Sequence, residues 1–366
     1  MRNAGRVLVY LLSFMAFAIL VGFLSLSHFW VFLKAPGSPS LGVREVVITP
    51  GTGSRGIGRL LHEKGIISNP MLFSFLCWYR SAGQKLKAGE YAFLALSTPQ
   101  RILDQLVTGR VVLHKVTFPE GSTIRDVAAI LHEKGLAPVH ETLRIAGDSQ
   151  SVQEFGIPAA SLEGYLFPET YHFEKAMSAP FILKTMVNEF RRRLPESWEQ
   201  NAEKLGLTLH QVVILASIVE KEAVLDGERP LIAAVFLNRL KRGMPLQSDP
   251  TAVYDLEDFR GPVEPIHLKR QSPYNTYWIK GLPPGPICNP GAKSIRAVLA
   301  PENVPYLYFV SNDDGSHQFS DSLEEHQKAV SRYYRKRKER QDEGGGEAPF
   351  RRGLLPQQPG EGGESR

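Results

Sequence analysis

Cysteine is scarce in this sequence. Of 366 residues only Cys77 and Cys288 are cysteines, and they lie far apart. No C-x-x-C pair occurs, which argues against a zinc ribbon or a thioredoxin-like redox site, and two free, partly buried thiols are expected. A set of scattered histidines lacks the spacing of metal ligands: His172, His210, His267, His317 and His326. We therefore expect no metal and no cofactor, and a metalloenzyme stays an alternative that EDTA would test.

A strong excess of one charge is also lacking. Lys and Arg number 43 against 38 Asp and Glu, which gives a net charge of +5. No basic helix with interleaved aromatic residues is found, so a nucleic-acid partner is not expected. The mild positive excess suits a neighbourhood of anionic lipid or anionic wall polymer.

Only one apolar run is long enough to span a bilayer. Residues 7–33 contain no charged side chain, and about 20 apolar residues cross the hydrocarbon core. A cleaved signal peptide is the alternative, but its apolar region is usually about 7 to 15 residues long and ends at small residues. Arg2 and Arg6 precede the run, so the positive-inside rule keeps residues 1–6 in the cytoplasm and sends the chain beyond Lys34 outside.

A linker rich in Pro, Gly and Ser follows at 34–42, and a pattern then occurs twice within 43–139. Val46-Val47-Ile48-Thr49-Pro50-Gly51 precedes a helical stretch that ends in Leu61-His62-Glu63-Lys64-Gly65. Val116-Thr117-Phe118-Pro119-Glu120-Gly121 precedes one that ends in Leu131-His132-Glu133-Lys134-Gly135. Both read as strand, turn, helix and glycine stop, so a duplicated supersecondary unit is expected.

The composition changes at about residue 140. Residues 140–334 are dense in aromatic residues, prolines and short motifs, and they are expected to form a second folded domain of mixed α and β structure. Residues 335–366 form a charged stretch followed by Gly, Pro and Gln, which cannot bury enough apolar surface to order itself. The predicted fold class is α+β, with an N-terminal transmembrane helix and a disordered tail.

The stretch 209–223 predicts a buried helix that ends in charged residues. Thr208 can cap it, and its apolar residues leave little polar face. Glu220, near its end, has two interpretations. Either the helix surfaces there and the charge is solvated, or the small neighbours Ala216 and Ala223 leave a hollow in which a carboxyl keeps its proton near neutral pH. A carboxyl of the second kind can donate a proton to a glycosidic oxygen.

The segments that follow favour the second interpretation. They are rigid loops that carry amides, hydroxyls and aromatic rings, the groups that hold sugars through hydrogen bonds and stacking. The candidates for contacting a sugar are Gln247, Asp249, Tyr274 and Asn275, together with Glu163 from an earlier segment. Stabilisation of the loops themselves is an equal alternative for the Gln, Tyr and Asn side chains.

Several of these motifs, in order and spacing, resemble the YceG-like family of endolytic murein transglycosylases. They are Leu162-Glu163-Gly164-Tyr165-Leu166-Phe167-Pro168-Glu169-Thr170-Tyr171, Ala216-Ser217-Ile218-Val219-Glu220-Lys221-Glu222, Asn238-Arg239-Leu240, Leu246-Gln247-Ser248-Asp249-Pro250-Thr251, Ser272-Pro273-Tyr274-Asn275-Thr276-Tyr277 and Gly281-Leu282-Pro283-Pro284-Gly285-Pro286. The resemblance extends to about Tyr334 and leaves the tail outside.

The resemblance implies a single-pass protein of the inner membrane, with a LysM-like region at 43–139 and an external catalytic domain at 140–334. It also implies that Glu220 is catalytic and that the substrate is the peptidoglycan glycan strand. Such an enzyme cleaves between MurNAc and GlcNAc without water and leaves a 1,6-anhydroMurNAc end. It is expected to act on newly made strands near the membrane, and peptidoglycan synthases are an open expectation as partners.

Two alternatives stay open from the residues alone. If Glu163, Glu169, Glu222 or Asp249 faces Glu220 across the substrate, a hydrolytic muramidase with two carboxylates becomes the second candidate. A wall-binding scaffold without catalysis is the third, because LysM-like modules bind glycan without cutting it.

Overall fold

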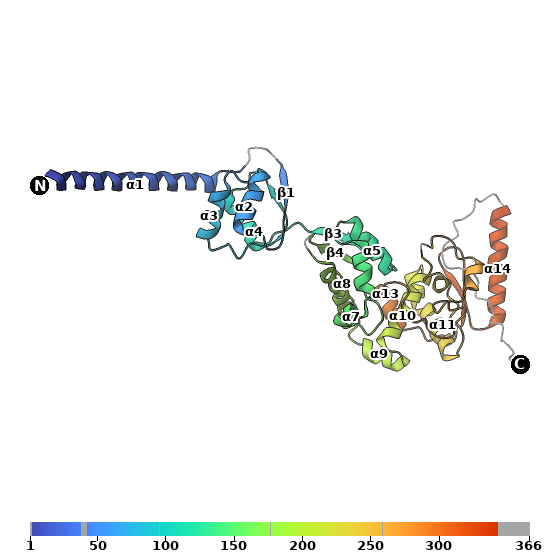
Figure 1. The fold of residues 1–366 in the computed structure, drawn as a ribbon. Helices are drawn as coiled ribbons and strands as arrows, with labels where there is room; N and C mark the ends of the chain where they lie inside the picture. Colours follow the sequence, from blue (N-terminus) through green and yellow to red (C-terminus); the bar gives the residue numbers. More distant parts are fainter. Residues whose placement is uncertain (1, 38–41, 95, 176, 258, 343–366) are drawn as a thin grey trace. The chain divides into compact units, whose positions relative to one another are not determined.

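A computed structural model describes residues 2–37, 42–94, 96–175, 177–257 and 259–342 (Figure 1). The chain forms two compact units, and each is described by itself. The first consists of the chain up to Lys115 together with His172–Met177, and the second of Val116–Tyr171 and the chain from Ser178 onward. The predicted α+β class is confirmed: helices dominate the described residues, which also contain three two-stranded sheets, β1-β2, β3-β4 and β5-β6.

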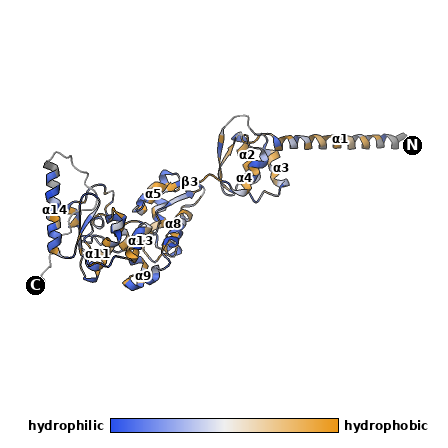
Figure 2. Ribbon diagram, turned by 180° about the vertical axis from the view of Figure 1, so that it is seen from behind, coloured by the Kyte–Doolittle hydropathy of each residue, from blue (hydrophilic) through white to orange (hydrophobic). Residues whose placement is uncertain are grey.

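Helix α1 opens the first unit. It spans Arg2–Lys34, and its part Val9–Lys34 is long and apolar enough to cross a membrane. Figure 2 shows it apolar along most of its length. The consecutive helices α9 and α10 pass the same test only together, but they are bent by 86° against each other. Since α10 is buried within the second unit, we take α1 as the one candidate span in the described chain.

The rest of the first unit packs around one apolar core. Its elements are β1 (Val43–Ile48), α2 (Ser54–Glu63), α3 (Pro70–Tyr79), β2 (Gly89–Leu94) and α4 (Pro99–Thr108). Strand β3 (His114–Thr117) begins in this unit and continues into the second at Val116. Strand β1 pairs antiparallel with β2, from Val43 opposite Leu94 to Ile48 opposite Gly89. Phe29, Phe32 and Leu33, at the end of α1, are buried in the same core. The end of α1 is therefore an integral part of this unit.

The second unit surrounds helix α10. Its elements are α5 (Ile124–Glu133), α6 (Val139–Gly147), α7 (Ser149–Glu154), β4 (Thr170–Phe173), α8 (Ala179–Arg193), α9 (Trp198–Leu205), α10 (Leu209–Glu222), η1 (Asp226–Glu228), α11 (Arg229–Lys241), η2 (Asp249–Ala252), α12 (Pro265–Leu268), α13 (Ala292–Leu299), β5 (Tyr308–Ser311), β6 (His317–Ser320) and α14 (Leu323–Asp342). Strand β4 crosses the boundary between the units. Helix α10 packs against α11 and α13, and its residues from Val212 to Val219 are all buried.

Local signals explain where α10 begins. Thr208 caps it through a capping box with Gln211: the Thr208 hydroxyl accepts from the Gln211 N–H, and the Gln211 side chain accepts from the Thr208 N–H. This reciprocal pair satisfies two backbone N–H groups at the start of the helix that have no partner within it. The predicted cap at Thr208 is confirmed.

The duplicated pattern forms the expected elements but not one module. Its first copy builds β1 and α2 in the first unit, and its second copy builds β3 and α5, with α5 in the second unit. The region predicted as one LysM-like part, 43–139, is thus divided between the two units. The predicted start of the tail at Arg335 also differs, because α14 continues as helix to Asp342, and residues 343–366 lie outside the described residues.

Candidate active site at the end of helix α10

Glu220 lies in the last turn of α10, with its side chain only 5% exposed. One carboxylate oxygen accepts from Arg229 Nη1 at 3.0 Å, and the other accepts from the backbone N–H of Gly291 at 2.9 Å. The apolar hollow expected from the sequence is therefore wrong in its detail. The neighbour Ala216 is buried as expected, but the carboxylate itself faces two hydrogen-bond donors from other segments.

Arg229 begins α11 and is held from several sides. Its side chain is 8% exposed, its Nε donates to Asp226 at 3.1 Å, and its Nη1 also donates to the Ser294 hydroxyl at the start of α13. Asp226 in turn forms an ion pair with Lys293. A guanidinium fixed by three partners presents one N–H in a set direction, so Glu220 receives an oriented positive charge.

The segment Asn289–Gly291 joins this site to the second copy of the repeat. The Asn289 N–H and side-chain amide both donate to the Ser122 carbonyl, at 2.8 and 2.9 Å, and the Gly121 N–H donates to the Asn289 carbonyl at 3.0 Å. Lys221 Nζ, next to Glu220, donates to the Gly121 carbonyl at 2.7 Å. The turn before α5 and the end of α10 therefore lie side by side.

Glu163, a predicted sugar contact, is buried beside this turn. Its carboxyl accepts from the Ile124 N–H at 3.1 Å, from Tyr254 OH at 2.9 Å and from Asn289 Nδ2 at 3.2 Å. Burial raises the pKa of Glu163 to about 7, although the Ile124 and Tyr254 hydrogen bonds lower it. In this position Glu163 braces the first turn of α5 and the Asn289 segment rather than facing solvent.

Gln247 and Asp249 are also buried, behind α10. Gln247 Oε1 accepts from Arg239 Nη1 at 3.1 Å, and Asp249 accepts from Tyr277 OH at 2.6 Å. The Ser248 hydroxyl donates to Glu222, whose pKa is raised to about 8 by burial and then by the charge of Asp249. Gln247 has a φ of +52°, uncommon for a residue with a side chain, and this conformation turns the loop under α10.

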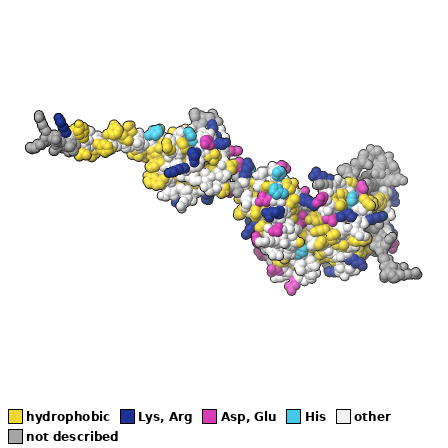
Figure 3. Space-filling model, in the orientation of Figure 1, with side chains coloured by type: hydrophobic (Ala, Val, Ile, Leu, Met, Phe, Trp, Pro, Cys, Tyr) yellow, Lys and Arg dark blue, Asp and Glu magenta, His cyan; other side chains and the backbone are white. Residues whose placement is uncertain are grey.

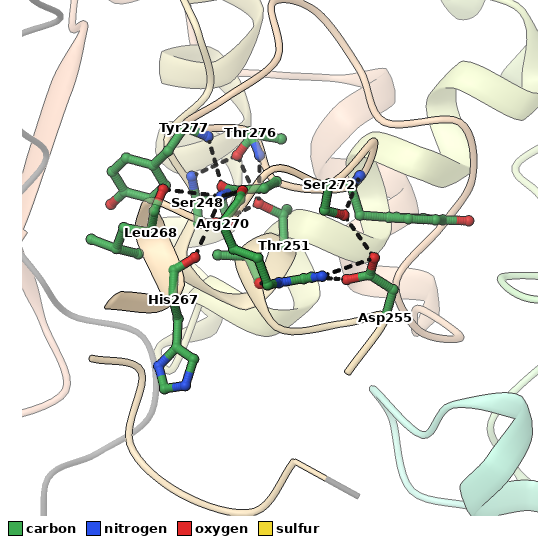
Figure 4. Close-up of polar contacts among 12 residues, drawn as sticks. Ser248, Thr251, Asp255, His267, Leu268, Arg270, Ser272, Thr276 and Tyr277 are labelled. Carbon is green, nitrogen blue, oxygen red and sulfur yellow. Dashed lines mark hydrogen bonds and ion pairs between the residues drawn. The ribbon is translucent and has the colours of Figure 1, made fainter. Parts of the chain in front are cut away.

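Figure 4 shows a polar network in which Asp255 binds Arg270 and Ser272. Tyr274 and Asn275 follow Ser272 in the same loop. Asn275 is fully buried, and its Nδ2 donates to the carbonyls of Leu268 and Arg270 at 3.0 and 2.7 Å. Its amide therefore stabilises the loop, the alternative that the sequence left open. Tyr274 is only partly buried, packs on Tyr254 with ring centroids 4.7 Å apart, and is the most accessible of the five candidates.

Glu120 is a site residue that the sequence did not single out. It is exposed in the turn before α5 and lies against Gly291, where a methyl group would meet Glu120 Oε1 at 1.9 Å. Although the residue as a whole is exposed, partial burial of its carboxyl and the charge of Glu220 raise the pKa of Glu120, whereas Arg229 and Lys293 lower it to a smaller extent. The available signal was its position: Glu120 stands between Pro119 and Gly121, where the first copy has Pro50 followed directly by Gly51.

Neither cysteine lies where it could act as a nucleophile. Both Cys77 and Cys288 are buried and free, as predicted, and burial raises the pKa of the Cys77 thiol to about 11. Across the described part of the chain, no group of three His, Cys, Asp or Glu side chains is placed to hold a metal ion.

The fold and the position of this carboxylate at a helix end can be compared with known proteins. The YceG-like family profile matches residues 46–332, and the chain belongs to this family. It is 31% identical to an endolytic murein transglycosylase of Bacillus subtilis over 80% of this chain and 85% of that protein. It is 29% identical to one of Streptococcus pneumoniae, over 79% of this chain and 58% of that longer protein.

A crystal structure described as a yceG-like protein of Listeria monocytogenes is similar in fold. The TM-score is 0.55 at 33% sequence identity, and the likeness covers 79% of this chain and all of that one. The family and the enzyme class predicted from the sequence are confirmed by these comparisons. The five sugar contacts and the catalytic role of Glu220 stay predictions.

Proposed function

We propose that this protein is an endolytic lytic transglycosylase of peptidoglycan, with Glu220 as its central catalytic residue. The observation that carries the proposal is the placement of Glu220: a carboxylate buried at a helix end, with Arg229 on one oxygen and the Gly291 N–H on the other. The relatives named endolytic murein transglycosylases support the substrate and the reaction.

The reaction needs two proton transfers and no water. A proton passes to the glycosidic oxygen between MurNAc and GlcNAc, the bond from that oxygen to C1 of MurNAc breaks, and GlcNAc leaves with a free 4-hydroxyl. The 6-hydroxyl of the same MurNAc then gives its proton to a carboxylate while O6 bonds to C1, which produces the 1,6-anhydro ring. Because the nucleophile belongs to the substrate, Glu220 could perform both transfers in turn.

Arg229 gives Glu220 its electrostatic setting. Whenever Glu220 carries a negative charge during the cycle, the guanidinium 3.0 Å away stabilises that charge inside a site with little water. The Gly291 N–H does the same for the other oxygen and also fixes the direction of the carboxylate plane. Substitution of Arg229 should therefore reduce the rate without removing the acid itself.

The test is product analysis with the full chain in detergent on purified glycan strands. We expect muropeptides that end in 1,6-anhydroMurNAc, and their loss by at least about 100-fold in Glu220→Gln. Glu203→Gln, an exposed carboxylate of α9 in the same unit, is the matched control. Products one water heavier, with reducing MurNAc ends, would indicate a muramidase, and no release at all would leave the wall-binding scaffold.

We further propose that α1 anchors the protein in the inner membrane with residues 1–6 in the cytoplasm and the second unit outside. The apolar run and the position of Arg2 and Arg6 support this orientation. A site near the membrane surface fits cleavage of newly made strands, and peptidoglycan synthases are the partners to look for. Protease added to intact spheroplasts should digest the second unit, and full protection would contradict the orientation.

A further inference from the structure

Two carboxyl groups meet at one residue of the site. Gly291 donates its N–H to Glu220 Oε2 at 2.9 Å, and the Glu120 carboxyl lies against the α-carbon of the same glycine. The φ of Gly291 is −75°, which any residue can adopt, so a glycine is needed at 291 for space and not for backbone freedom. Any side chain there would displace Glu120.

The hydrogen bonds of Glu220 indicate where a proton resides in this pair. Both of its oxygens accept from groups that can only donate, the guanidinium of Arg229 and a backbone N–H. The two carboxyl groups are close enough for the charge of Glu220 to raise the pKa of Glu120, and two like charges at one site favour sharing a single proton. Of the two carboxyl groups, Glu120 is therefore the one whose oxygens leave room for a proton.

Solvent exposure also distinguishes the two carboxyl groups. Glu120 is exposed at the tip of its turn, whereas the side chain of Glu220 is 5% exposed. An exposed carboxyl can meet the glycosidic oxygen of an incoming strand, and a buried carboxylate held by two donors can accept a proton from a bound hydroxyl. The first copy of the repeat makes its turn without this Glu, so the turn itself does not require the residue.

We propose that Glu120 is a second catalytic carboxyl, the general acid, and that Glu220 is the general base. This inference rests on the proposed transglycosylase function and divides its two proton transfers between two residues. Glu120 gives its proton to the leaving oxygen as the C1–O bond breaks, and Glu220 takes the proton of the MurNAc 6-hydroxyl as O6 bonds to C1. Transfer from Glu220 back to Glu120 resets the pair, so no proton is gained or lost.

The experiment compares two leaving groups. The full chain in detergent is given glycan strands, whose leaving alcohol needs protonation, and a GlcNAc–MurNAc oligosaccharide with 4-methylumbelliferone at the reducing end, whose leaving group does not. For Glu120→Gln we expect the rate on glycan strands to fall about 100-fold or more, but the rate on the aryl glycoside to fall only a few-fold. The loss of activity at alkaline pH, where the acid is deprotonated, should also disappear. Glu220→Gln should lose activity on both the glycan strands and the aryl glycoside.

Matched controls keep the outcomes separate. Glu133→Gln changes an exposed carboxylate of α5 that pairs only with its neighbour Lys134 at 3.3 Å, and it should behave as wild type. Full activity of Glu120→Gln on strands would overturn the inference, as would an equal loss on both substrates, which marks a positioning role. If the wild-type chain yields no anhydro ends, the proposed function fails instead.

A second inference concerns the surface of helix α3, and different residues carry it. One side of α3 is buried in the first unit through Phe73, Leu76 and Cys77. The other side exposes four large apolar residues, of which Met71 is 77% and Trp78 is 72% exposed, together with Phe75 and Tyr79. Figure 3 shows apolar side chains along α1 and over α3. Such a set is unusual on a face in water.

The exposed side of α3 continues the surface of the candidate membrane helix. Phe75 contacts Phe29 of α1 edge to face at 5.1 Å and packs on Trp78 at 5.4 Å. Trp30, exposed on α1, carries Lys34 over its ring at 5.1 Å. Tryptophan, tyrosine and lysine gather at the headgroup level of membranes, and residues 42–115 hold ten Lys and Arg against four Asp and Glu.

We infer that α3 lies in the headgroup region of the bilayer that α1 crosses, with Trp78 inserted among anionic lipids. The test measures tryptophan fluorescence of the full chain in nanodiscs of phosphatidylglycerol and phosphatidylcholine. The phosphatidylcholine is brominated near the headgroup, and bromine quenches a tryptophan that lies close to it. Variants keep one of the four tryptophans, Trp30, Trp78 or Trp278, and replace the others with Phe. We expect at least twofold quenching for Trp30 and Trp78 and little for Trp278, exposed in the second unit. Quenching of Trp30 with Trp78 unquenched would overturn the inference. Quenching of neither would overturn it as well, and would also contradict the proposal that α1 crosses the membrane.

Discussion

The two copies of the strand-helix repeat form the same local structure, but they lie in different units and contact different residues. Helices α2 and α5 are both ten residues long and end in the same five-residue sequence. Gly65 has a φ of +65° and Gly135 one of +64°, and the Gly65 and Gly135 N–H groups donate to His62 and His132 at 2.8 and 2.9 Å. The shared ending predicts that the local sequence sets how each helix stops, although Arg44 also donates to the Lys64 carbonyl at the first ending.

The copies differ at the opposite end of the helix. The first begins at Gly53, which has no side chain to cap it, whereas Thr123 caps the second in a box with Asp126. The second copy also carries Glu120 in its turn, and its first turn donates to Glu163. The two copies therefore differ at the N-terminal turn, where the second carries Glu120 and contacts Glu163.

The largest expected effect comes from one added methyl group at Gly291, which displaces Glu120. Gly291→Ala places a Cβ 1.9 Å from Glu120 Oε1, and the exposed Glu120 side chain should move away at little cost to folding. We expect the release of anhydro ends to fall about 100-fold, as for loss of an acid, with the thermal midpoint nearly unchanged. Activity close to wild type would show that the second copy adds nothing essential through Glu120. Gly51→Ala would be unsuitable as a control, because its φ of +83° strains any side chain.

A second prediction is that the stabilities of the two units depend on pH in opposite directions. Burial raises the pKa of Glu222 to about 8, so the folded second unit keeps a proton that the unfolded chain releases near pH 4.5. The contribution of Glu222 to stability is full below about pH 4.5 and falls as the pH rises toward 8, by an amount on the order of 5 kcal/mol. Glu222→Gln should flatten this slope in urea unfolding between pH 5 and 8.5.

The first unit should respond in the opposite direction. Burial alone would raise the pKa of Glu90, but the hydrogen bonds from His114 and Lys175 prevail and lower it. Glu90 therefore stabilises the folded unit above the pKa of the unfolded chain, and that contribution is lost as the pH falls through the lowered value. Hydrogen exchange in peptides from β2 and α10 would resolve the two trends, and parallel trends in both units would contradict this contrast.

A smaller effect tests the shared ending. Gly65→Ala and Gly135→Ala each force alanine into the left-handed region, which costs roughly 1 to 2 kcal/mol. If the two endings are equivalent, hydrogen exchange in α2 and α5 should accelerate by similar factors. A clear difference would mean that tertiary packing, and not the local sequence, holds one of these turns.

The smallest effect concerns the caps. Thr123→Ala should destabilise α5 by about 1 kcal/mol because the Asp126 N–H loses its acceptor. Gly53→Ser should stabilise α2 by a few tenths of a kcal/mol, since the backbone at 53 is already extended and a side chain there meets no neighbouring atom. Unchanged exchange in both helices would show that the caps do not distinguish the copies.

The sequence predicted what is local and missed what distant segments bring together. Helix α10, its Thr208 cap and the position of Glu220 follow from apolar spacing and one capping box. The partners of Glu220 could not follow in this way, because Arg229 and Gly291 reach it from two other elements. Glu120 lay in a repeat interpreted as purely structural, and Asn275 had the composition of a sugar contact but is fully buried in its own loop.

The buried end of α1 bears on how this enzyme can be handled. Phe29, Phe32 and Leu33 lie in the core of the first unit, so the folded part of this unit begins before the last residue of the apolar run. A soluble version begun at Lys34 would lose these three side chains and expose the surface they cover, which invites aggregation. Cutting instead within the exposed part of α1, before His28, would keep the core intact while discarding most of the lipid-facing length.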